Sequence, residues 1–345
     1  MVVETPWSTL GYLVAKRTYT RLLDPTLGPD SPTEEWEDVI ERVIEACDSQ
    51  LNVGFDTDEE DRVREYMLGL KFSVAGRFLW QLGTETVDRI GLASLQNCAF
   101  TTIDHPIRPF TWAMDMLCLG SGVGYNIQKH NVDKLPEVRT WFKAPTRWDD
   151  GGADFIVPDS REGWVRLLGK TLKAAFLSHA PEKGTFSYST QVVRGAGSPI
   201  RGFGGVAQGP QALVEGIADI SKILERRKGK KIRPIDALDI MNLIGRVVVS
   251  GNVRRSAQIA IGDCHDVDFL KAKRWDLGTI PPWRAMSNNS VIADKIEDLP
   301  EEFWEGYKGN GEAYGIINLK LSRQVGRLGD YQYPDPLING VNPFH

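Results

Sequence analysis

The sequence predicts an α/β fold preceded by a helical segment. Residues 1 to about 90 carry apolar residues at helical spacing, as in Trp36, Val39 and Val43, which share one helix face. From about residue 91, short apolar runs alternate with helices and glycine-rich loops, as α/β folds require. A chain of 345 residues with 41% apolar and 25% charged residues can bury a large core in one large or two ordinary domains.

Two helices are expected in the N-terminal segment. The run Ser31-Pro32-Thr33-Glu34 is typical of a helix start, because a serine cap is followed by a proline in the first turn and a glutamate three residues on. A second helix is expected over residues 59–70. We expect both helices to have a structural role.

The later elements follow from apolar runs and the breaks between them. Candidate strands cover residues 95–101, 257–261, 289–292 and 314–319. Candidate helices cover residues 108–119, 210–224 and 235–249.

Bulk properties exclude several classes of protein. The net charge of -5 gives no whole-chain reason to bind nucleic acid or an anionic membrane. No apolar run approaches the roughly 18 residues that span a bilayer, and the N-terminus lacks the features of a signal peptide. The widely spaced Cys47, Cys98, Cys118 and Cys264 form neither a disulfide framework nor a zinc site. We therefore expect a reducing, cytoplasmic location.

Two adjacent arginines, Arg254 and Arg255, lie between the apolar end of a predicted helix and a predicted core strand. An unpaired buried charge costs several kcal/mol, so the pair needs a partner. A neighbouring Asp or Glu would serve, and so would the phosphate of a bound nucleotide. The rest of the chain favours phosphate.

Two glycine-rich segments are candidate ligand loops. Residues 120–125 have the glycine spacing of a dinucleotide-binding fingerprint, but they follow a helix, so they are either a turn or a ligand-facing loop. Residues 194–210 hold five glycines between 195 and 205 and reach a helix start at Pro210, where free N–H groups form an anion site. The alternative for this second segment is a surface connector.

Cys98 lies in the apolar run of residues 94–100. A cysteine in such a strand is usually a small buried hydrophobe, so spacing alone does not make it functional. Cys47 and Cys118 continue helical apolar faces, and Cys264 follows a strand in a polar turn.

Together these segments resemble the large catalytic chain of ribonucleotide reductases, in particular the adenosylcobalamin-dependent, monomeric type that reduces ribonucleoside triphosphates. The similarity extends in family order from about Arg17 to Pro343. The matching segments are 76–80, 94–100, 120–126, 159–165, 202–210, 242–246, 250–262, 287–291 and 311–327.

The resemblance implies a ten-stranded α/β barrel, built from two parallel half-sheets, behind a helical domain. Residues 1–90 would form the helical domain. Residues 91–345 would form the first half of the barrel, with loops of an allosteric specificity site at about 202–209 and 250–257.

The resemblance also implies radical chemistry. A thiyl radical generated from adenosylcobalamin removes the 3′ hydrogen of the ribose, the 2′ hydroxyl leaves as water, and two further cysteines supply the electrons. Cys98 matches the first of that pair, and no cysteine of this chain matches the second. A thioredoxin-like reductant would restore the thiols by exchange.

Binding residues are implied in the same way, and none of them is a metal ligand. The substrate, a ribonucleoside tri- or diphosphate, would be contacted by Ser73, Ser94, Asn97, Gly122 and Gly124. A deoxynucleoside triphosphate effector, coupled to the substrate site through a mobile loop, would be contacted by Asp104, Arg201, Gly204, Gly205, Arg254 and Arg255.

The last residues depart from the family pattern Asn-Pro-Cys-x-Glu, whose Asn holds the ribose hydroxyls, whose Cys carries the radical and whose Glu is the general base. Asn342 and Pro343 match, but Phe344 stands at the cysteine position and cannot form a thiyl radical. A complementing C-terminal polypeptide would then supply the radical cysteine, the Glu, the remaining strands and most of the adenosylcobalamin site.

Alternatives remain open. Half a barrel leaves a long unpaired strand edge, which a naturally split enzyme would cover with its second chain. A truncation, or a catalytically inactive remnant that binds deoxynucleotides, would also explain Phe344. The large chain of a diiron-dependent reductase is the nearest other family, since it shares the barrel.

Overall fold

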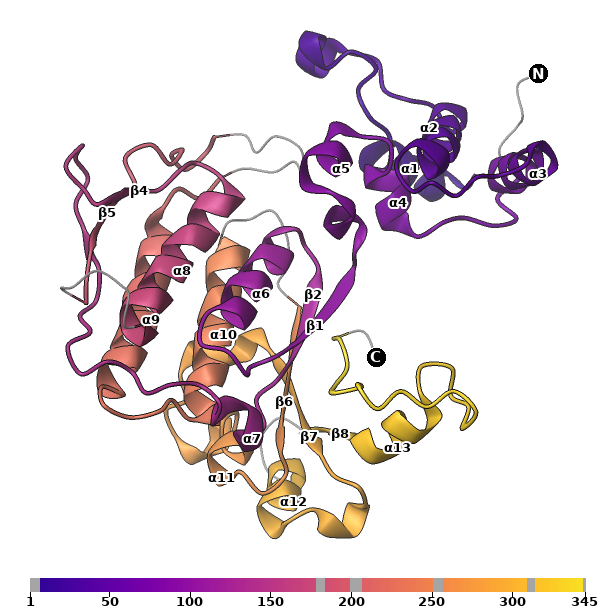
Figure 1. Cartoon of the computed structure of the whole chain (residues 1–345). Helices are drawn as coiled ribbons and strands as arrows, with labels where there is room; N and C mark the ends of the chain where they lie inside the picture. The colour runs from indigo at the N-terminus through magenta and orange to yellow at the C-terminus, as the bar shows by residue number, and fades with distance from the viewer. Residues whose placement is uncertain (1–6, 178–183, 199–206, 251–256, 309–313, 344–345) are drawn as a thin grey trace. The chain divides into compact units, whose positions relative to one another are not determined.

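The computed structural model describes residues 7–177, 184–198, 207–250, 257–308 and 314–343 (Figure 1). The chain divides into two compact units, residues 1–97 and 98–345.

The first unit is helical. Its apolar core includes Val39, Ile40, Met67 and Leu82, all of them fully buried, so the predicted face of the helix near residue 40 is confirmed. The helices are α1 (Thr9–Thr18), α2 (Trp36–Ser49), α3 (Thr57–Leu68), α4 (Gly76–Gln81) and α5 (Glu85–Ile90), with 3₁₀ turns at η1 (Pro25–Asp30) and η2 (Leu92–Leu95).

The predicted helix start at Ser31 was wrong. Helix α2 begins at Trp36, where Glu35 and Asp38 form a reciprocal capping box. Residues 31–34 are instead held extended, because Thr33 bridges to Leu22 in an antiparallel pair. The Ser31 hydroxyl accepts a hydrogen bond from the backbone N–H of Asp24.

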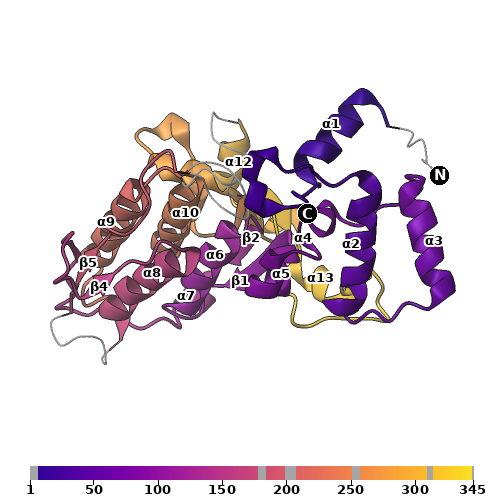
Figure 2. The same ribbon diagram turned by 90° about the horizontal axis from the view of Figure 1, so that it is seen from above.

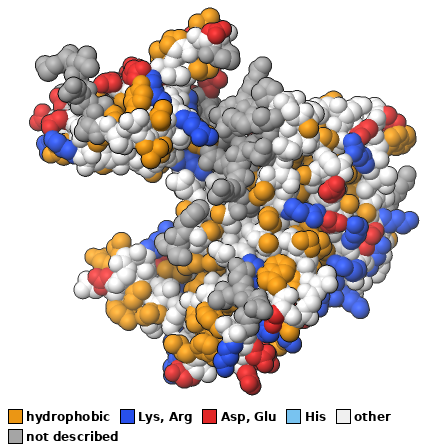
Figure 3. Space-filling view, turned by 180° about the vertical axis from the view of Figure 1, so that it is seen from behind, with side chains coloured by type: hydrophobic (Ala, Val, Ile, Leu, Met, Phe, Trp, Pro, Cys, Tyr) orange, Lys and Arg blue, Asp and Glu red, His pale blue; other side chains and the backbone are white. Residues whose placement is uncertain are grey.

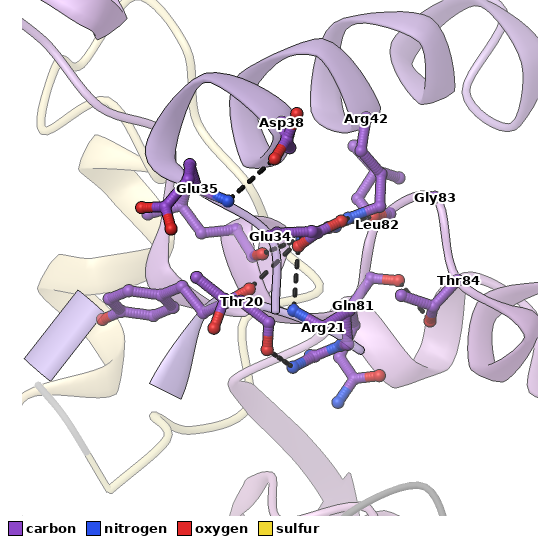
Figure 4. A network of polar contacts seen from close by, with 12 residues as sticks. Thr20, Arg21, Glu34, Glu35, Asp38, Arg42, Gln81, Leu82, Gly83 and Thr84 are labelled. Carbon is purple, nitrogen blue, oxygen red and sulfur yellow. Dashed lines mark hydrogen bonds and ion pairs between the residues drawn. The ribbon is translucent and has the colours of Figure 1, made fainter. Parts of the chain in front are cut away.

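One buried ion pair joins the parts of this unit (Figure 4). The Nε atom of Arg42 lies 2.7 Å from Oε1 of Glu34, and both side chains are largely buried. The same guanidinium donates to the backbone carbonyls of Tyr19, Leu79 and Leu82. Arg42 therefore connects α2 to α4 and to the chain between α1 and η1.

The second unit is built on an all-parallel sheet of five strands in the order β1-β2-β6-β7-β8. The strands are β1 (Cys98–Thr102), β2 (Gly122–Asn126), β6 (Gln258–Asp263), β7 (Asn288–Ile292) and β8 (Gly315–Ile317). Helices α6 (Arg108–Cys118) and α10 (Pro234–Ser250) cover one face of this sheet, and the C-terminal segment lies on the other (Figure 1).

A second, three-stranded parallel sheet lies in the long connection between β2 and β6, beside helices α8 and α9 (Figure 2). Its order is β3-β5-β4, from β3 (Thr146–Arg147), β4 (Phe155–Ile156) and β5 (Ser187–Ser189). The helices of this connection are α7 (Lys129–Val132), α8 (Arg161–Phe176) and α9 (Gln211–Arg226). The remaining elements are α11 (Val267–Leu270), η3 (Trp275–Leu277), η4 (Pro282–Met286), η5 (Ile296–Asp298), α12 (Glu301–Lys308) and α13 (Leu319–Val325).

The structure confirms the parallel α/β fold and corrects it at one strand. The predicted elements near residues 108–119, 210–224, 235–249, 257–261, 289–292 and 314–319 are α6, α9, α10, β6, β7 and β8. Most of the glycine segment 120–125, predicted as a turn or a ligand-facing loop, instead belongs to the buried strand β2. Glycine inside a strand is typical of a place where another backbone approaches closely, and that is the case here. Strand β1 begins at Cys98, because residues 92–95 form the turn η2.

No helix in the described ranges is long and apolar enough to span a bilayer.

Replacing Arg42 with Ala should lower the free energy of unfolding by about 3–5 kcal/mol, because Glu34 would keep a buried charge without its partner. Urea unfolding of the intact chain, followed by tryptophan fluorescence, measures the change. Lys71→Ala removes the exposed ion pair with Glu65 and serves as the control. Equal midpoints for the two variants would contradict a central role for Arg42.

Candidate functional site

Glycines and a cysteine lie on the face of the large sheet that points away from the helices. In the parallel register Cys98 is opposite Gly122, and Phe100 is opposite Gly124. Because side chains alternate along a strand, these positions share one face, and Val123 points to the other. The sheet therefore presents a smooth strip of backbone beside the Cys98 sulfur.

The C-terminal segment crosses this strip. A Cβ atom built on Gly124 would lie 1.9 Å from the Val341 carbonyl oxygen and 3.1 Å from the Cα atom of Asn342. A Cβ on Gly340 would lie 2.3 Å from the ring of Phe100. At Gly124 the clash is with backbone, so glycine is required there, whereas a side chain at position 340 would have to displace the Phe100 ring.

Four of the predicted site residues are thus brought together: Cys98, Gly122, Gly124 and Asn342. The backbone of Asn342 lies against Gly124. Gly122 and its partner Cys98 lie two residues before Gly124 and Phe100 on their strands, which corresponds to a distance of about 6.7 Å along each strand. The backbone of Asn342 and the residue Cys98 therefore lie on the same face of the sheet.

The four cysteines differ in their surroundings. Burial raises the pKa of Cys118 to about 12. Burial also raises the pKa values of Cys47 and Cys264 above the ordinary thiol range. Because the thiolate is the reactive form in thiol–disulfide exchange, these three thiols are poor participants. Cys98 is partly exposed at the start of β1.

Three predicted substrate contacts lie in the helical unit. Ser73 is exposed, and its hydroxyl donates to the Val74 carbonyl. Ser94 is fully buried, and its hydroxyl donates to the carbonyl of Gly91 at 2.8 Å. Asn97 is exposed.

Arg77 is a residue to which the sequence analysis gave no role. Its buried side chain donates from Nε to the Asn97 side-chain oxygen at 3.0 Å, and from Nη1 to the Ser94 carbonyl at 3.2 Å. Arg77 thereby fixes the turn that leads directly into Cys98. An arginine beside the apolar run Phe78-Leu79-Trp80 was the available signal, since a buried guanidinium needs partners.

Most predicted effector contacts lie outside the described residues: Arg201, Gly204, Gly205, Arg254 and Arg255. Phe344 also lies outside them. Asp104 is exposed in the turn after β1. Ala207, within the first predicted specificity loop at 202–209, exchanges backbone hydrogen bonds with Gly197 and Ser198, which precede that loop, at 2.8 Å each. Helix α9 begins directly after Pro210, as predicted.

Within the described ranges, no group of three or more His, Cys, Asp or Glu side chains could hold a metal ion.

Comparison with known proteins identifies relatives of the chain. Residues 133–224 match the family model described as "B12-dependent ribonucleotide reductase, insertion domain". The chain is 33% identical over 401 aligned residues to the adenosylcobalamin-dependent ribonucleoside-triphosphate reductase of Lacticaseibacillus paracasei, covering 99% of this chain and 52% of that protein. It is 32% identical to the enzyme of the same name from Lactobacillus leichmannii, covering 53% of it.

A crystal structure of a B12-dependent (class II) ribonucleotide reductase is similar with a TM-score of 0.81 and 29% sequence identity, over 99% of this chain and 54% of that one. The family resemblance seen in the motifs is therefore confirmed. The chain spans about half the length of the curated relatives it matches.

Replacing Gly124 with Ala should displace Val341 and Asn342, because the added methyl group cannot share space with the backbone. We expect faster hydrogen–deuterium exchange in the C-terminal peptide and a stability loss of about 1–3 kcal/mol. Gly151→Ala is the matched control, since a Cβ there meets nothing within 4 Å. Unchanged exchange in Gly124→Ala would show that the contact does not persist in solution.

The four cysteines should differ in the rate at which iodoacetamide alkylates them. At pH 8 the raised pKa of Cys118 leaves it on the order of 1,000-fold less thiolate than an ordinary thiol, so its alkylation should be the slowest. Cys98 should be labelled first. Peptide mass spectrometry after timed iodoacetamide treatment gives the order, and labelling in urea, where all four sites should react alike, is the control. Faster reaction of Cys118 than of Cys98 would contradict the ranking.

Proposed function

We propose that the chain forms the Cys98-bearing part of an adenosylcobalamin-dependent ribonucleotide reductase, which converts ribonucleotides to deoxyribonucleotides. One observation carries the proposal. Two residues implied to act on the ribose, Cys98 and Asn342, lie on one face of a parallel sheet, although they are 244 positions apart in the sequence. The similarity over 99% of the chain supports the same conclusion.

The chemistry that Cys98 would perform is a reduction. Loss of the 2′ hydroxyl as water requires two electrons and two protons, which two thiols supply when they become one disulfide. Cys98 would donate one sulfur, and the remainder of the enzyme would donate the other. The Asn342 amide can donate and accept hydrogen bonds, which suits a pair of neighbouring ribose hydroxyls.

Adenosylcobalamin supplies the initiating radical in this enzyme class. Following the family resemblance, we place the binding of the cofactor mainly in the other half of the enzyme. No step through it is assigned to this chain.

The remainder of the enzyme would cover an apolar surface near the C-terminal end of the described chain (Figure 3, lower left). Among the described strands, β8 pairs only with β7, so its outer edge is open. Exposed apolar side chains on and after β8 are Ile316, Leu321, Leu328, Tyr331, Tyr333 and Leu337. We propose that a second half-sheet, supplied by a complementing C-terminal polypeptide, packs against this surface and completes the barrel.

The substrate would be a ribonucleoside triphosphate, as the names of the relatives suggest, and a diphosphate is the alternative. A deoxynucleoside triphosphate would bind at the 202–209 and 250–257 loops as effector. A thioredoxin-like protein would re-reduce the disulfide, and the enzyme would act in the cytoplasm.

A second candidate function is binding without catalysis. Phe344 stands where the relatives' pattern has its radical cysteine, which favours a chain that only senses deoxynucleotides. The diiron-dependent alternative is weaker, because residues 133–224 match a domain described for B12-dependent enzymes.

An activity assay tests the proposal. The chain is combined with a polypeptide supplying the relatives' remaining half, adenosylcobalamin, a dithiol protein and each ribonucleoside triphosphate. We expect deoxynucleotide product, and a loss on the order of 100-fold or more in Cys98→Ser, because one electron-donating sulfur is gone. Cys118→Ser is the control and should stay near the wild-type rate.

The absence of product with every substrate and effector would refute the reductase function. Deoxynucleotide binding by the chain alone, measured by calorimetry in the same series, would then support the sensing role.

A further inference from the structure

We propose that Asn126, Asn339 and Thr102 form a clamp that sets the position of Asn342 on the sheet. The inference rests on the proposed function for its catalytic meaning, but the clamp itself is a structural statement. Within the clamp, Asn339 and Asn126 are positioning residues, which act on the proposed ribose site through Asn342.

The clamp holds Asn339 by its side chain and by its backbone. Its side-chain Nδ2 donates to the Thr102 hydroxyl at 2.7 Å. Its backbone carbonyl accepts from Nδ2 of Asn126 at 2.9 Å. Two bonds to two neighbouring strands, β1 and β2, fix both the location and the orientation of this residue.

Asn126 is a rigid anchor. It is fully buried, and its Oδ1 accepts from the backbone N–H of Gln128 at 2.8 Å and from the Asn131 side chain at 3.2 Å. Those two donors fix the amide so that its Nδ2 group faces Asn339. Gln128 is held in turn by Asp263 at 2.8 Å, which ties the anchor to β6.

Helix α13 supplies a further support on the other side of the segment. Nε of Arg323 donates to the Ile338 carbonyl at 2.8 Å. Residues 338 and 339 are therefore held by α13 as well as by the sheet.

The order of contacts gives the segment a direction. Asn339 lies at the level of Thr102, Gly340 at the level of Phe100, and Asn342 at the level of Gly124. Phe100 and Gly124 pair in the register, two residues from Cys98 and Gly122. The segment thus runs against the strand direction toward Cys98, and the clamp fixes its distant end.

The hydrogen-bonding groups of asparagine explain why this residue type suits positions 126 and 339. The clamp needs a short side chain with a donor and an acceptor at each position. Aspartate at 126 would turn an oxygen toward the Asn339 carbonyl and bury a charge, which is costly. The nearly isosteric Asn126→Asp and Thr102→Val variants therefore remove clamp bonds without leaving cavities.

The first experiment uses the chain alone. Hydrogen–deuterium exchange of the peptide covering residues 337–343 should rise about tenfold in Asn339→Ala, Asn126→Asp and Thr102→Val, the effect of losing one or two hydrogen bonds. Thr102→Ser keeps the hydroxyl and should stay near wild type. Gln332→Ala, at an exposed position of the same C-terminal segment, is the control.

The second experiment uses the completed enzyme. Thr102→Val should bind ribonucleotide and 2′-deoxynucleotide with nearly equal affinity, because a displaced Asn342 no longer reads the hydroxyl. Wild type and Thr102→Ser should prefer the ribonucleotide. A purely structural role would lower both affinities together and leave their ratio unchanged.

Unchanged exchange in Asn339→Ala and Thr102→Val overturns the clamp, whatever the activity. A rise in exchange with an unaltered affinity ratio overturns its positioning role. If exchange rises in the clamp variants but the completed wild-type enzyme makes no product, the proposed function is rejected and the clamp is supported as a structural device.

Discussion

The close approach of the Val341–Asn342 backbone to Gly124 is the constraint on which the candidate site depends. A side chain at position 124 would occupy the space of the Val341 carbonyl oxygen. Only a bare strip of backbone lets an extended segment lie flat on a sheet face. Gly124 of β2, which would weaken an ordinary strand, therefore lets the Asn342 backbone lie on the sheet face that also carries Cys98.

Polar side chains fix the backbone next to two of the predicted site residues. Arg77 fixes the turn before Cys98 by holding Ser94 and Asn97. Asn126 and Asn339 fix the segment before Asn342. Such support is the usual requirement of a site that holds reacting groups in a fixed geometry.

The surroundings of the cysteines alter the pKa values of three of the four thiols. Desolvation keeps Cys118 protonated across the physiological range, and it acts in the same direction on Cys47 and Cys264. Cys98 is partly exposed at the start of β1, opposite Gly122 of β2. The relatives extend to about twice the matched length, which leaves room for the partner sulfur in their other half.

Sequence alone determined what depends on local pattern: the buried face of α2, the helices around the glycine loops, strand β6 and the family motifs around Cys98. It failed at β2, because glycine has no side chain with which to show strand periodicity. It also could not pair Thr102 with Asn339, which lie 237 positions apart. Strand order, the contact between Gly124 and Asn342 and the role of Arg77 were decided by tertiary structure, because hydrogen-bond partners distant in the chain leave no local pattern.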